Sequence, residues 1–217
     1  MSTSPAAAAP FPVLQAQGLQ FAFGAKAVVR DLSLQLLPGL SVLTGDEHSG
    51  KTTVLRLLAG VLMAQAGTLR LHGIDARTDA AAYRAQVFWA DPRDPRWEGV
   101  VVRHYLASVQ ALYPAWQADL LEALLDALAL SAHLDKRFDM LSAGSRRKVF
   151  LAAGFAAGAA LTLLDTPLAA LDRRSCDVVL ELLEEAALHP RRAWLVADYE
   201  APAIAPLAAH ITLPAPL

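Results

Sequence analysis

Leu43-Thr44-Gly45-Asp46-Glu47-His48-Ser49-Gly50-Lys51-Thr52-Thr53 is the stretch around which the rest of the chain is organised. It follows the apolar run Leu40–Leu43, which predicts a buried strand, and it precedes Thr53–Ala59, which predicts a helix that ends at Gly60. A strand, a loop and a helix in this order form the context that a phosphate-binding loop requires.

The spacing of two glycines, a lysine and a threonine fits the phosphate-binding pattern G-x-x-x-x-G-K-[ST], with Gly45, Gly50, Lys51 and Thr52 at its fixed positions. Gly50 lets backbone amides approach phosphate oxygens, and the helix that begins near Lys51 adds its positive dipole end. We expect Lys51 to neutralise the β- and γ-phosphates of a nucleotide and the Thr52 hydroxyl to be a ligand of Mg²⁺. The other expected nucleotide-binding residues here are Asp46, Glu47, His48, Ser49 and Thr53. The alternative interpretation is a glycine-containing turn that caps an ordinary helix.

The composition is that of a globular protein. The chain has 217 residues, of which 55% are hydrophobic and 18% are charged, so disorder is excluded for most of it and a large core is available. The formal net charge of −2 gives no electrostatic reason to expect a nucleic-acid partner. The single cysteine excludes an internal disulfide bond, so the fold does not depend on an oxidising compartment.

Two segments bear on targeting and membranes. Residues 1–12 are rich in Ala, Pro and Ser, contain no Lys or Arg, and predict a disordered leader rather than a signal peptide, with the folded domain over residues 13–217. The most apolar segment, Val149–Leu164, is shorter than the roughly 20 residues that span a bilayer. We therefore predict a buried helix followed by a buried strand in this segment, and no transmembrane helix.

Segments with strand and helix patterns alternate along residues 13–217. The predicted strands are Val13–Phe23, Ala27–Leu36, Leu40–Leu43, Thr68–Leu71, Val87–Ala90, Leu161–Leu164 and Ala193–Ala197. The helices predicted besides Thr53–Ala59 are Ala143–Ala157 and Arg173–Leu188. Residues 100–138 also have a helical pattern, in which the leucines at 120, 121, 124, 125 and 128 fall on one face. Prolines after residue 201 exclude a long closing helix.

This alternation predicts an α/β fold with a P-loop NTPase core. The sheet is expected to be mostly parallel, with two N-terminal antiparallel strands joined by a tight turn at Gly24–Lys26, and with an inserted helical subdomain at about residues 100–150. Ligands of such sheets bind at the carboxyl ends of the strands.

Three further stretches complete an ordered set of motifs. Leu161–Asp165 is an apolar strand that ends in a carboxylate, Leu141–Val149 has the sequence LSAGSRRKV, and Thr166–Asp172 follows the carboxylate directly. Together with the phosphate-binding loop, these stretches resemble the motifs of the nucleotide-binding domain of an ABC (ATP-binding cassette) transporter. The resemblance covers nearly the whole chain after residue 12.

The resemblance implies roles for several residues. Asp165 resembles the Walker B acid, which holds Mg²⁺, usually through water. Ser142 and the amide of Gly144 resemble the ABC signature, which closes over the γ-phosphate held by a second subunit and so implies a head-to-tail dimer with two ATP molecules between its subunits. Phe23 takes the place of the aromatic residue that stacks on adenine. The alternatives are a strand-end turn residue for Asp165, a simple N-cap for Ser142 and a core residue for Phe23.

The chain departs from the family pattern where hydrolysis takes place. Thr166 replaces the catalytic glutamate, and a hydroxyl does not accept a proton from attacking water as a carboxylate does. Asp198 replaces the switch histidine, and Asp91 replaces a glutamine but is still expected to be a ligand of Mg²⁺. Asp198 and Glu47 are the candidate substitutes for the missing base. The expected catalytic residues are Lys51, Asp165, Thr166 and Asp198.

Two family glycines are also replaced, by His48 in the loop and by Ala143 in the signature. Histidine tolerates positive φ better than most residues, so we expect the loop to keep its shape with some strain. Nucleotide binding is therefore expected to be retained, whereas activation of the attacking water is not.

The resemblance implies an ATP-binding subunit of an ABC transporter that binds MgATP, forms a homo- or heterodimer and hydrolyses ATP slowly. Its permease would be a separate chain, so the subunit is expected at the cytoplasmic face of the plasma membrane, with the permease in a groove beside residues 89–97 and the helical insertion. The alternative for the aromatic residues of 89–97, and the favoured one, is that they belong to the core. A non-catalytic ATP-binding module, either a degenerate heterodimer partner or a nucleotide-gated regulator, is the second hypothesis. A small-molecule kinase would leave Ser142–Lys148 unexplained.

Overall fold

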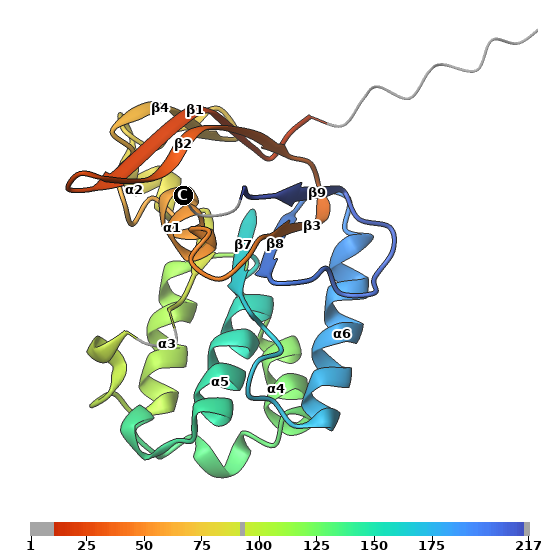
Figure 1. The fold of residues 1–217 in the computed structure, drawn as a ribbon. Helices are drawn as coiled ribbons and strands as arrows, with labels where there is room; N and C mark the ends of the chain where they lie inside the picture. The colour runs from red at the N-terminus through yellow and green to blue at the C-terminus, as the bar shows by residue number, and fades with distance from the viewer. Residues whose placement is uncertain (1–10, 92–93, 215–217) are drawn as a thin grey trace, which may run out of the picture.

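A five-stranded parallel sheet lies at the centre of this computed structural model, which describes residues 11–91 and 94–214 (Figure 1). The strand order is β6-β7-β8-β3-β9. The strand bounds are β3 Gly39–Thr44, β6 Val87–Trp89, β7 Leu161–Asp165, β8 Ala193–Asp198 and β9 Ala209–Thr212. The first four confirm the predicted parallel sheet, whose inner strands are mostly apolar and are buried almost throughout because both of their faces are covered. β9 is not among the predicted strands because it is short and lies between prolines.

A second, antiparallel sheet packs over one side of the first. Its strands are β1 Leu14–Phe23, β2 Lys26–Leu36, β4 Ala66–Leu71 and β5 Ile74–Asp75, in the order β2-β1-β4-β5. The pairing of β1 with β2 confirms the predicted N-terminal hairpin, while β4 begins at Ala66 rather than at Thr68. Helix α1, Lys51–Leu58, contributes Leu55 and Leu58 to the core that joins the two sheets.

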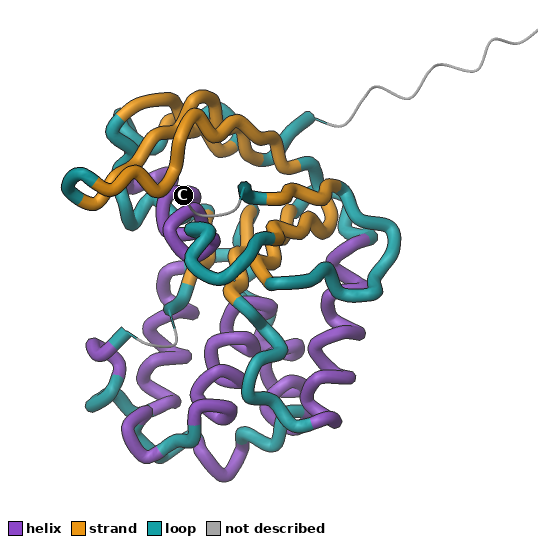
Figure 2. The backbone as a smooth tube through the Cα atoms, viewed as in Figure 1, coloured by secondary structure: helices purple, strands orange, loops and turns teal. Residues whose placement is uncertain are grey.

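The other long helices gather on the opposite side of the parallel sheet, as the purple segments of Figure 2 show. They are α3 Val102–Leu112, α4 Ala118–Ala127, α5 Ala143–Ala156 and α6 Arg173–Ala187, which confirms the predicted helical insertion and both flanking helices. The remaining helical segments are α2 Ala80–Arg84 and three 3₁₀ turns, Pro95–Trp97, Ser131–His133 and Phe138–Met140. α2 escapes sequence analysis because its five residues contain too little periodicity.

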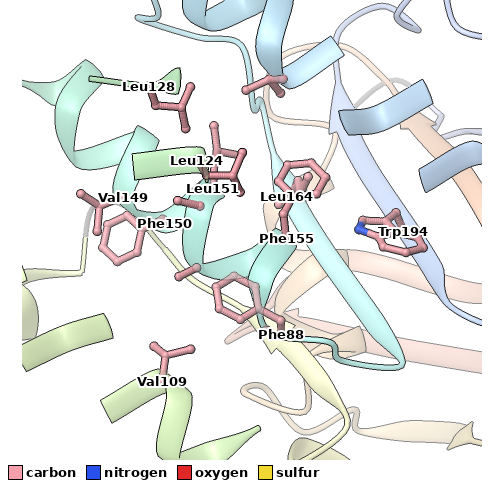
Figure 3. Close-up of a cluster of buried hydrophobic side chains, with 14 of the residues drawn as sticks. Phe88, Val109, Leu124, Leu128, Val149, Phe150, Leu151, Phe155, Leu164 and Trp194 are labelled. Atoms are coloured by element: carbon pink, nitrogen blue, oxygen red, sulfur yellow. The ribbon is translucent and has the colours of Figure 1, made fainter. Parts of the chain in front are cut away.

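The helical insertion shares one hydrophobic core with the parallel sheet (Figure 3). Phe88 of β6, Leu164 of β7 and Trp194 of β8 lie in one cluster with Phe155 of α5. A Cβ atom on Gly154 would lie 2.8 Å from the Phe88 ring, so glycine allows the close approach of α5 to the sheet. The insertion therefore does not form a separate core.

The predicted leucine face of α4 is confirmed. Leu124 and Leu128 are buried, and the other three leucines of the pattern pack against the same cluster. Val149–Leu164 forms most of the buried half of α5 and the buried strand β7, as predicted. Over residues 11–91 and 94–214, no helix is both long enough and apolar enough to cross a membrane. The predicted leader lies outside the described residues except for Phe11 and Pro12.

Candidate functional site

The carboxyl ends of three parallel strands meet at one edge of the sheet. Thr44, the last residue of β3, pairs with Asp198, the last residue of β8. Asp165, the last residue of β7, pairs with Ala197 on the other side of β8. The loop that follows β3 therefore lies beside both acidic residues, at the position where ligands of parallel sheets bind.

The loop between β3 and α1 has the backbone geometry of an anion cradle. His48 has φ 62° and Gly50 has φ 95°, so the predicted positive φ at His48 is confirmed. A Cβ atom on Gly50 would lie 2.9 Å from Cγ1 of Val28, and one on Gly45 would lie 2.6 Å from Oγ of Ser49. Glycine is required at both positions because side chains there would collide with their neighbours.

Several donors of this loop are available to an anion. Gly50 caps the N-terminus of α1 without any side-chain hydrogen bond, so the first amides of the helix are not satisfied by a capping side chain. The Oγ atom of Ser49 is buried and makes no hydrogen bond to any described residue. Asp46, Glu47 and His48 are exposed on the outer side of the loop. The residues present therefore fit the phosphates of a nucleotide.

Lys51 lies inside the loop with only 8% of its surface exposed. Its Nζ atom donates to the carbonyl oxygens of Gly45, at 2.6 Å, and of Asp46, at 2.8 Å. The same atom lies 4.3 Å from the centre of the Tyr199 ring. Sequence analysis does not identify Tyr199. This residue directly follows Asp198, but it belongs to none of the motifs.

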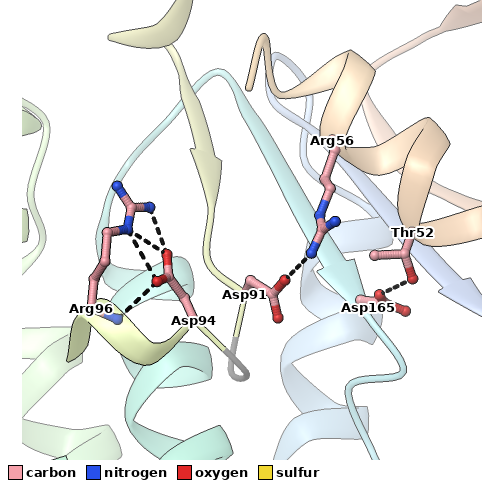
Figure 4. A network of polar contacts seen from close by, with 6 residues as sticks. All are labelled: Thr52, Arg56, Asp91, Asp94, Arg96 and Asp165. Atoms are coloured by element: carbon pink, nitrogen blue, oxygen red, sulfur yellow. Dashed lines mark hydrogen bonds and ion pairs between the residues drawn. The ribbon is translucent and has the colours of Figure 1, made fainter. Parts of the chain in front are cut away.

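Thr52 and Asp165 face each other across the gap between α1 and β7 (Figure 4). The Thr52 hydroxyl donates to Oδ2 of Asp165 at 2.6 Å, so the structure brings two of the three predicted metal-binding residues together. Adjacent ligands of an octahedral Mg²⁺ lie about 3 Å apart, because each is about 2.1 Å from the ion. Two hard oxygen atoms that are hydrogen-bonded at 2.6 Å would need to move apart by only a few tenths of an ångström to hold Mg²⁺ together. The described residues hold no cluster of three His, Cys, Asp or Glu side chains, so phosphate oxygens and water would complete the coordination.

Asp91 lies next to this pair but has a partner of its own. Trp89 pairs with Leu163, so Asp91, two residues further along, reaches the same end of the sheet as Asp165. Its Oδ2 atom accepts a hydrogen bond from Arg56 of α1 at 2.6 Å (Figure 4). Arg56 belongs to none of the sequence motifs, so sequence analysis does not predict its ion pair with Asp91. The role of Asp91 as a ligand of Mg²⁺ remains a prediction, and would require this carboxylate to be shared with Arg56.

Thr166 is held by its backbone immediately after Asp165. Its N–H donates to the carbonyl oxygen of Ala197 at 2.8 Å, and its own carbonyl accepts from Arg147 at 3.0 Å. Its φ of 44° places a β-branched residue in the left-handed region, where such residues are rare. Strain of this kind persists only where the surroundings fix the backbone, and the two hydrogen bonds do so here.

The signature-like stretch forms the beginning of α5, which points away from both sheets (Figure 1). Ser142 is the N-cap, and its Oγ atom accepts from the amide of Ser145 at 3.1 Å. A Cβ atom on Gly144 would lie 2.5 Å from the carbonyl oxygen of Ala170. Ser142 and Gly144 thus contact Ser145 and the segment around Ala170, and no hydrogen bond among the described residues joins them to the loop after β3.

Asp172 lies beside this signature-like stretch. Lys148 of α5 donates to its Oδ2 atom at 2.5 Å, and Ser175 donates through both its amide and its hydroxyl. The hydrogen bond from Lys148, followed by those from Ser175, lowers the pKa of Asp172 far below its ordinary value. Asp172 is therefore the N-cap of α6 and also tethers α5 to the segment after β7.

Phe23 ends β1 at the tip of the hairpin. Its exposed fraction is 53%, and its ring packs edge-on against Phe21 with the ring centroids 4.8 Å apart. This exposure rules out the alternative of a core residue and leaves a ring face free for stacking.

A family model and several known proteins match most of this chain. The family model described as "ABC transporter" matches residues 29–169. The chain is 33% identical to the cytochrome c biogenesis ATP-binding export protein CcmA of Pseudomonas savastanoi, over 75% of this chain and 77% of that protein. It is 36% identical to the CcmA protein of Alkalilimnicola ehrlichii, over 74% of this chain and 70% of that protein. It is 28% identical to mouse ATP-binding cassette sub-family A member 17, of whose length it spans only 10%.

Solved structures support the same fold. The chain superposes on an ATP-binding subunit of an ABC transporter with a TM-score of 0.77 at 20% identity, over 86% of this chain and 79% of that one. An ABC transporter ATP-binding protein from Pyrococcus furiosus gives a TM-score of 0.71 at 22% identity, over 92% of this chain and 96% of that one. At these identities, the likeness shows the fold alone.

Proposed function

Because this chain belongs to the ABC transporter family, we propose that it is an ATP-binding subunit that binds MgATP, pairs with a second ABC subunit and supplies energy to a separate permease. The observation that carries the proposal is the convergence of Lys51, Thr52 and Asp165 at one edge of the parallel sheet. The CcmA relatives are named as export proteins, which supports export as the direction of transport.

The loop residues would bind and orient the nucleotide. The first amides of α1 and the buried hydroxyl of Ser49 donate to phosphate oxygens, and Lys51 exchanges its carbonyl partners for the β- and γ-phosphates. Thr52 and Asp165 would hold Mg²⁺, the aspartate directly or through water, and the ion would offset the negative charge of the phosphates. The exposed ring of Phe23 is available to stack on the base.

A second subunit would complete the site. The start of α5 carries Ser142 and Gly144, whose contacts are with Ser145 and the segment around Ala170 rather than with the loop of their own chain. Arranged head to tail, two subunits would each place this helix start over the γ-phosphate held by the other, where its amides favour an anion.

Hydrolysis would be slow because no carboxylate occupies position 166. Of the two candidate substitutes, Asp198 is the better placed, because it ends β8 next to Asp165 in the sheet. Glu47 lies on the outer side of the loop, with 75% of its side chain exposed. Loss of a general base typically lowers the rate by about 10²- to 10⁴-fold.

The second candidate is a degenerate heterodimer partner. The observation that favours it is the contrast between the retained signature residues, Ser142 and Gly144, and the missing carboxylate at Thr166. Such a subunit would complete the site of a competent partner without hydrolysing its own nucleotide.

The proposed function is tested with the purified wild-type chain. Calorimetry is expected to detect uptake of MgATP, and sedimentation is expected to show a dimer only when MgATP is present. Hydrolysis that requires a second, competent ABC subunit would favour the heterodimer over the homodimer. Failure of the wild-type chain to take up MgATP would contradict the proposal.

A groove beside the nucleotide site is the proposed seat of the permease. Its volume is about 510 Å³, and its apolar lining includes Trp89, Trp97, Val109, Leu112 and Tyr113. Leu112 is 66% exposed and Val61, on the same groove, is 58% exposed. Both tryptophans are partly exposed, so each packs against the edge of the hydrophobic core and also lines the groove. The lining also includes the charged Arg56, Asp91, Asp94 and Arg96, so an amphipathic helix of a permease on the cytoplasmic face of the membrane would fit this surface.

We expect Leu112→Asp to reduce recovery of the chain with membranes from its natural host by about tenfold or more, because a carboxylate in an apolar contact loses its hydration without gaining a partner. The matched control is Leu188→Asp. Leu188 is 72% exposed but caps the end of α6 and does not line the groove. Equal recovery of the two variants would show that the groove is not the docking surface.

A further inference from the structure

Three groups of the protein itself contact the Lys51 ammonium group. An ammonium group has three N–H donors, and two of those of Lys51 point to the carbonyl oxygens of Gly45 and Asp46. The ring of Tyr199 lies 4.3 Å from Nζ, a distance typical of a cation–π contact. The aromatic ring is thus one of the contacts that Lys51 would exchange for phosphate oxygens.

The position of Tyr199 is set by the end of β8. Asp198 is fixed in the sheet beside Thr44, and its Oδ1 atom accepts a hydrogen bond from the amide of Tyr199 at 2.8 Å. Tyr199 itself is 56% exposed, whereas Tyr83 and Tyr105 are fully buried. An exposed aromatic ring directed at a nearly buried cation is not explained by packing of the core.

The ring has space on its other side. A cavity of about 350 Å³ is bordered by Tyr199 together with Pro167, Leu168 and Pro202. The ring is therefore able to leave Lys51 without displacing the core, which a buried ring is not.

We infer that Tyr199 is a residue of the triphosphate site that competes with the nucleotide for Lys51. This inference rests on the proposed function, since it concerns the affinity of the same loop for MgATP. In the nucleotide-free protein the ring stabilises a state that does not bind the phosphates, so the apparent affinity is lowered by the fraction of molecules in that state. A cation–π contact at a half-exposed site corresponds to about a 2- to 10-fold change in affinity.

The experiment compares two variants with the wild-type chain by calorimetry with MgATP. Tyr199→Leu keeps an apolar side chain but has no π-face, and is expected to bind MgATP about 2- to 10-fold more tightly. Tyr199→Phe restores the π-face without the hydroxyl, and is expected to return the affinity to within about twofold of the wild-type value. Because the side chain is exposed, neither substitution removes a core contact.

A spectroscopic measurement follows the contact without nucleotide. The chain has four tyrosines, and in 3-fluorotyrosine-labelled protein Tyr199→Phe identifies the ¹⁹F signal of Tyr199. Lys51→Ala is expected to shift this signal, because the ring loses the neighbouring charge. A structural role of Tyr199 elsewhere would leave the signal unchanged.

Two results would overturn the inference while the wild-type chain still binds MgATP. Weaker binding by Tyr199→Leu would mean that the ring supports the nucleotide rather than competes with it. Unchanged binding by Tyr199→Leu would mean that the contact has no effect on the site. By contrast, absence of MgATP uptake by the wild-type chain would contradict the proposed function itself.

Discussion

Lys51→Ala is expected to weaken binding of MgATP by about 100-fold or more. The Lys51 ammonium group is nearly buried inside the loop. It would contact the β- and γ-phosphates at once. Truncating one partner of a charge-assisted hydrogen bond in a desolvated site typically costs about 2 to 5 kcal/mol, or about 30-fold to several thousand-fold in affinity. Calorimetry with MgATP measures the change directly.

The control for this variant is Lys136→Ala. It removes the same charge from the helical insertion, where Lys136 interacts with His133 rather than with the loop, so binding is expected to stay unchanged. A melting curve of each variant shows whether the fold is intact. Folded Lys51→Ala protein that binds MgATP like the wild-type chain would mean that the loop does not hold a triphosphate, and the proposed function would fall with it.

Thr166→Glu is expected to accelerate ATP hydrolysis by about 10²- to 10⁴-fold at saturating MgATP. Hydrogen bonds to Ala197 and from Arg147 fix the backbone of residue 166 directly after Asp165. A longer side chain that starts from this position would bring a carboxylate to the same edge of the sheet as Thr52 and Asp165. The measurement is steady-state phosphate release by the purified protein.

Thr166→Gln separates the carboxylate from the length of the side chain. It has the shape of the glutamate variant and shares its unfavourable positive φ, but it has no basic oxygen. We expect its rate to remain at the wild-type level. If Thr166→Glu is also no faster than the wild-type chain, the base lies elsewhere, and a loss of the basal rate in Asp198→Asn would assign it to Asp198.

The nucleotide loop and the two buried strands around it are predictable from the sequence, because each is a continuous segment with its own pattern. The apolar run before Gly45 and the one before Asp165 indicate strands, and parallel pairing then requires both ends to meet at one edge. The structure confirms this meeting in the hydrogen bond between Thr52 and Asp165.

Single-residue contacts between distant segments are not predictable in this way. Tyr199 meets Lys51 and Arg56 meets Asp91 only because the fold brings α1 together with separate loops, and neither of these pairs has a fixed spacing along the chain. The short elements β5, α2 and β9 are missed for a different reason. Segments of two to five residues contain only one or two repeats of a burial pattern, so propensity and tertiary pairing decide them.

One turn of α1 connects the phosphate loop to the groove lined by Trp89 and Leu112. Thr52 and Arg56 are four residues apart, so they project from the same side of the helix, where one holds Asp165 and the other holds Asp91. Both side chains also form part of the groove lining. A tilt of α1 would pull on Asp165 and Asp91 together and would reshape the floor of the groove where we propose that a permease binds. A movement of α1 would thus carry a change in the phosphate loop to the groove without a separate hinge.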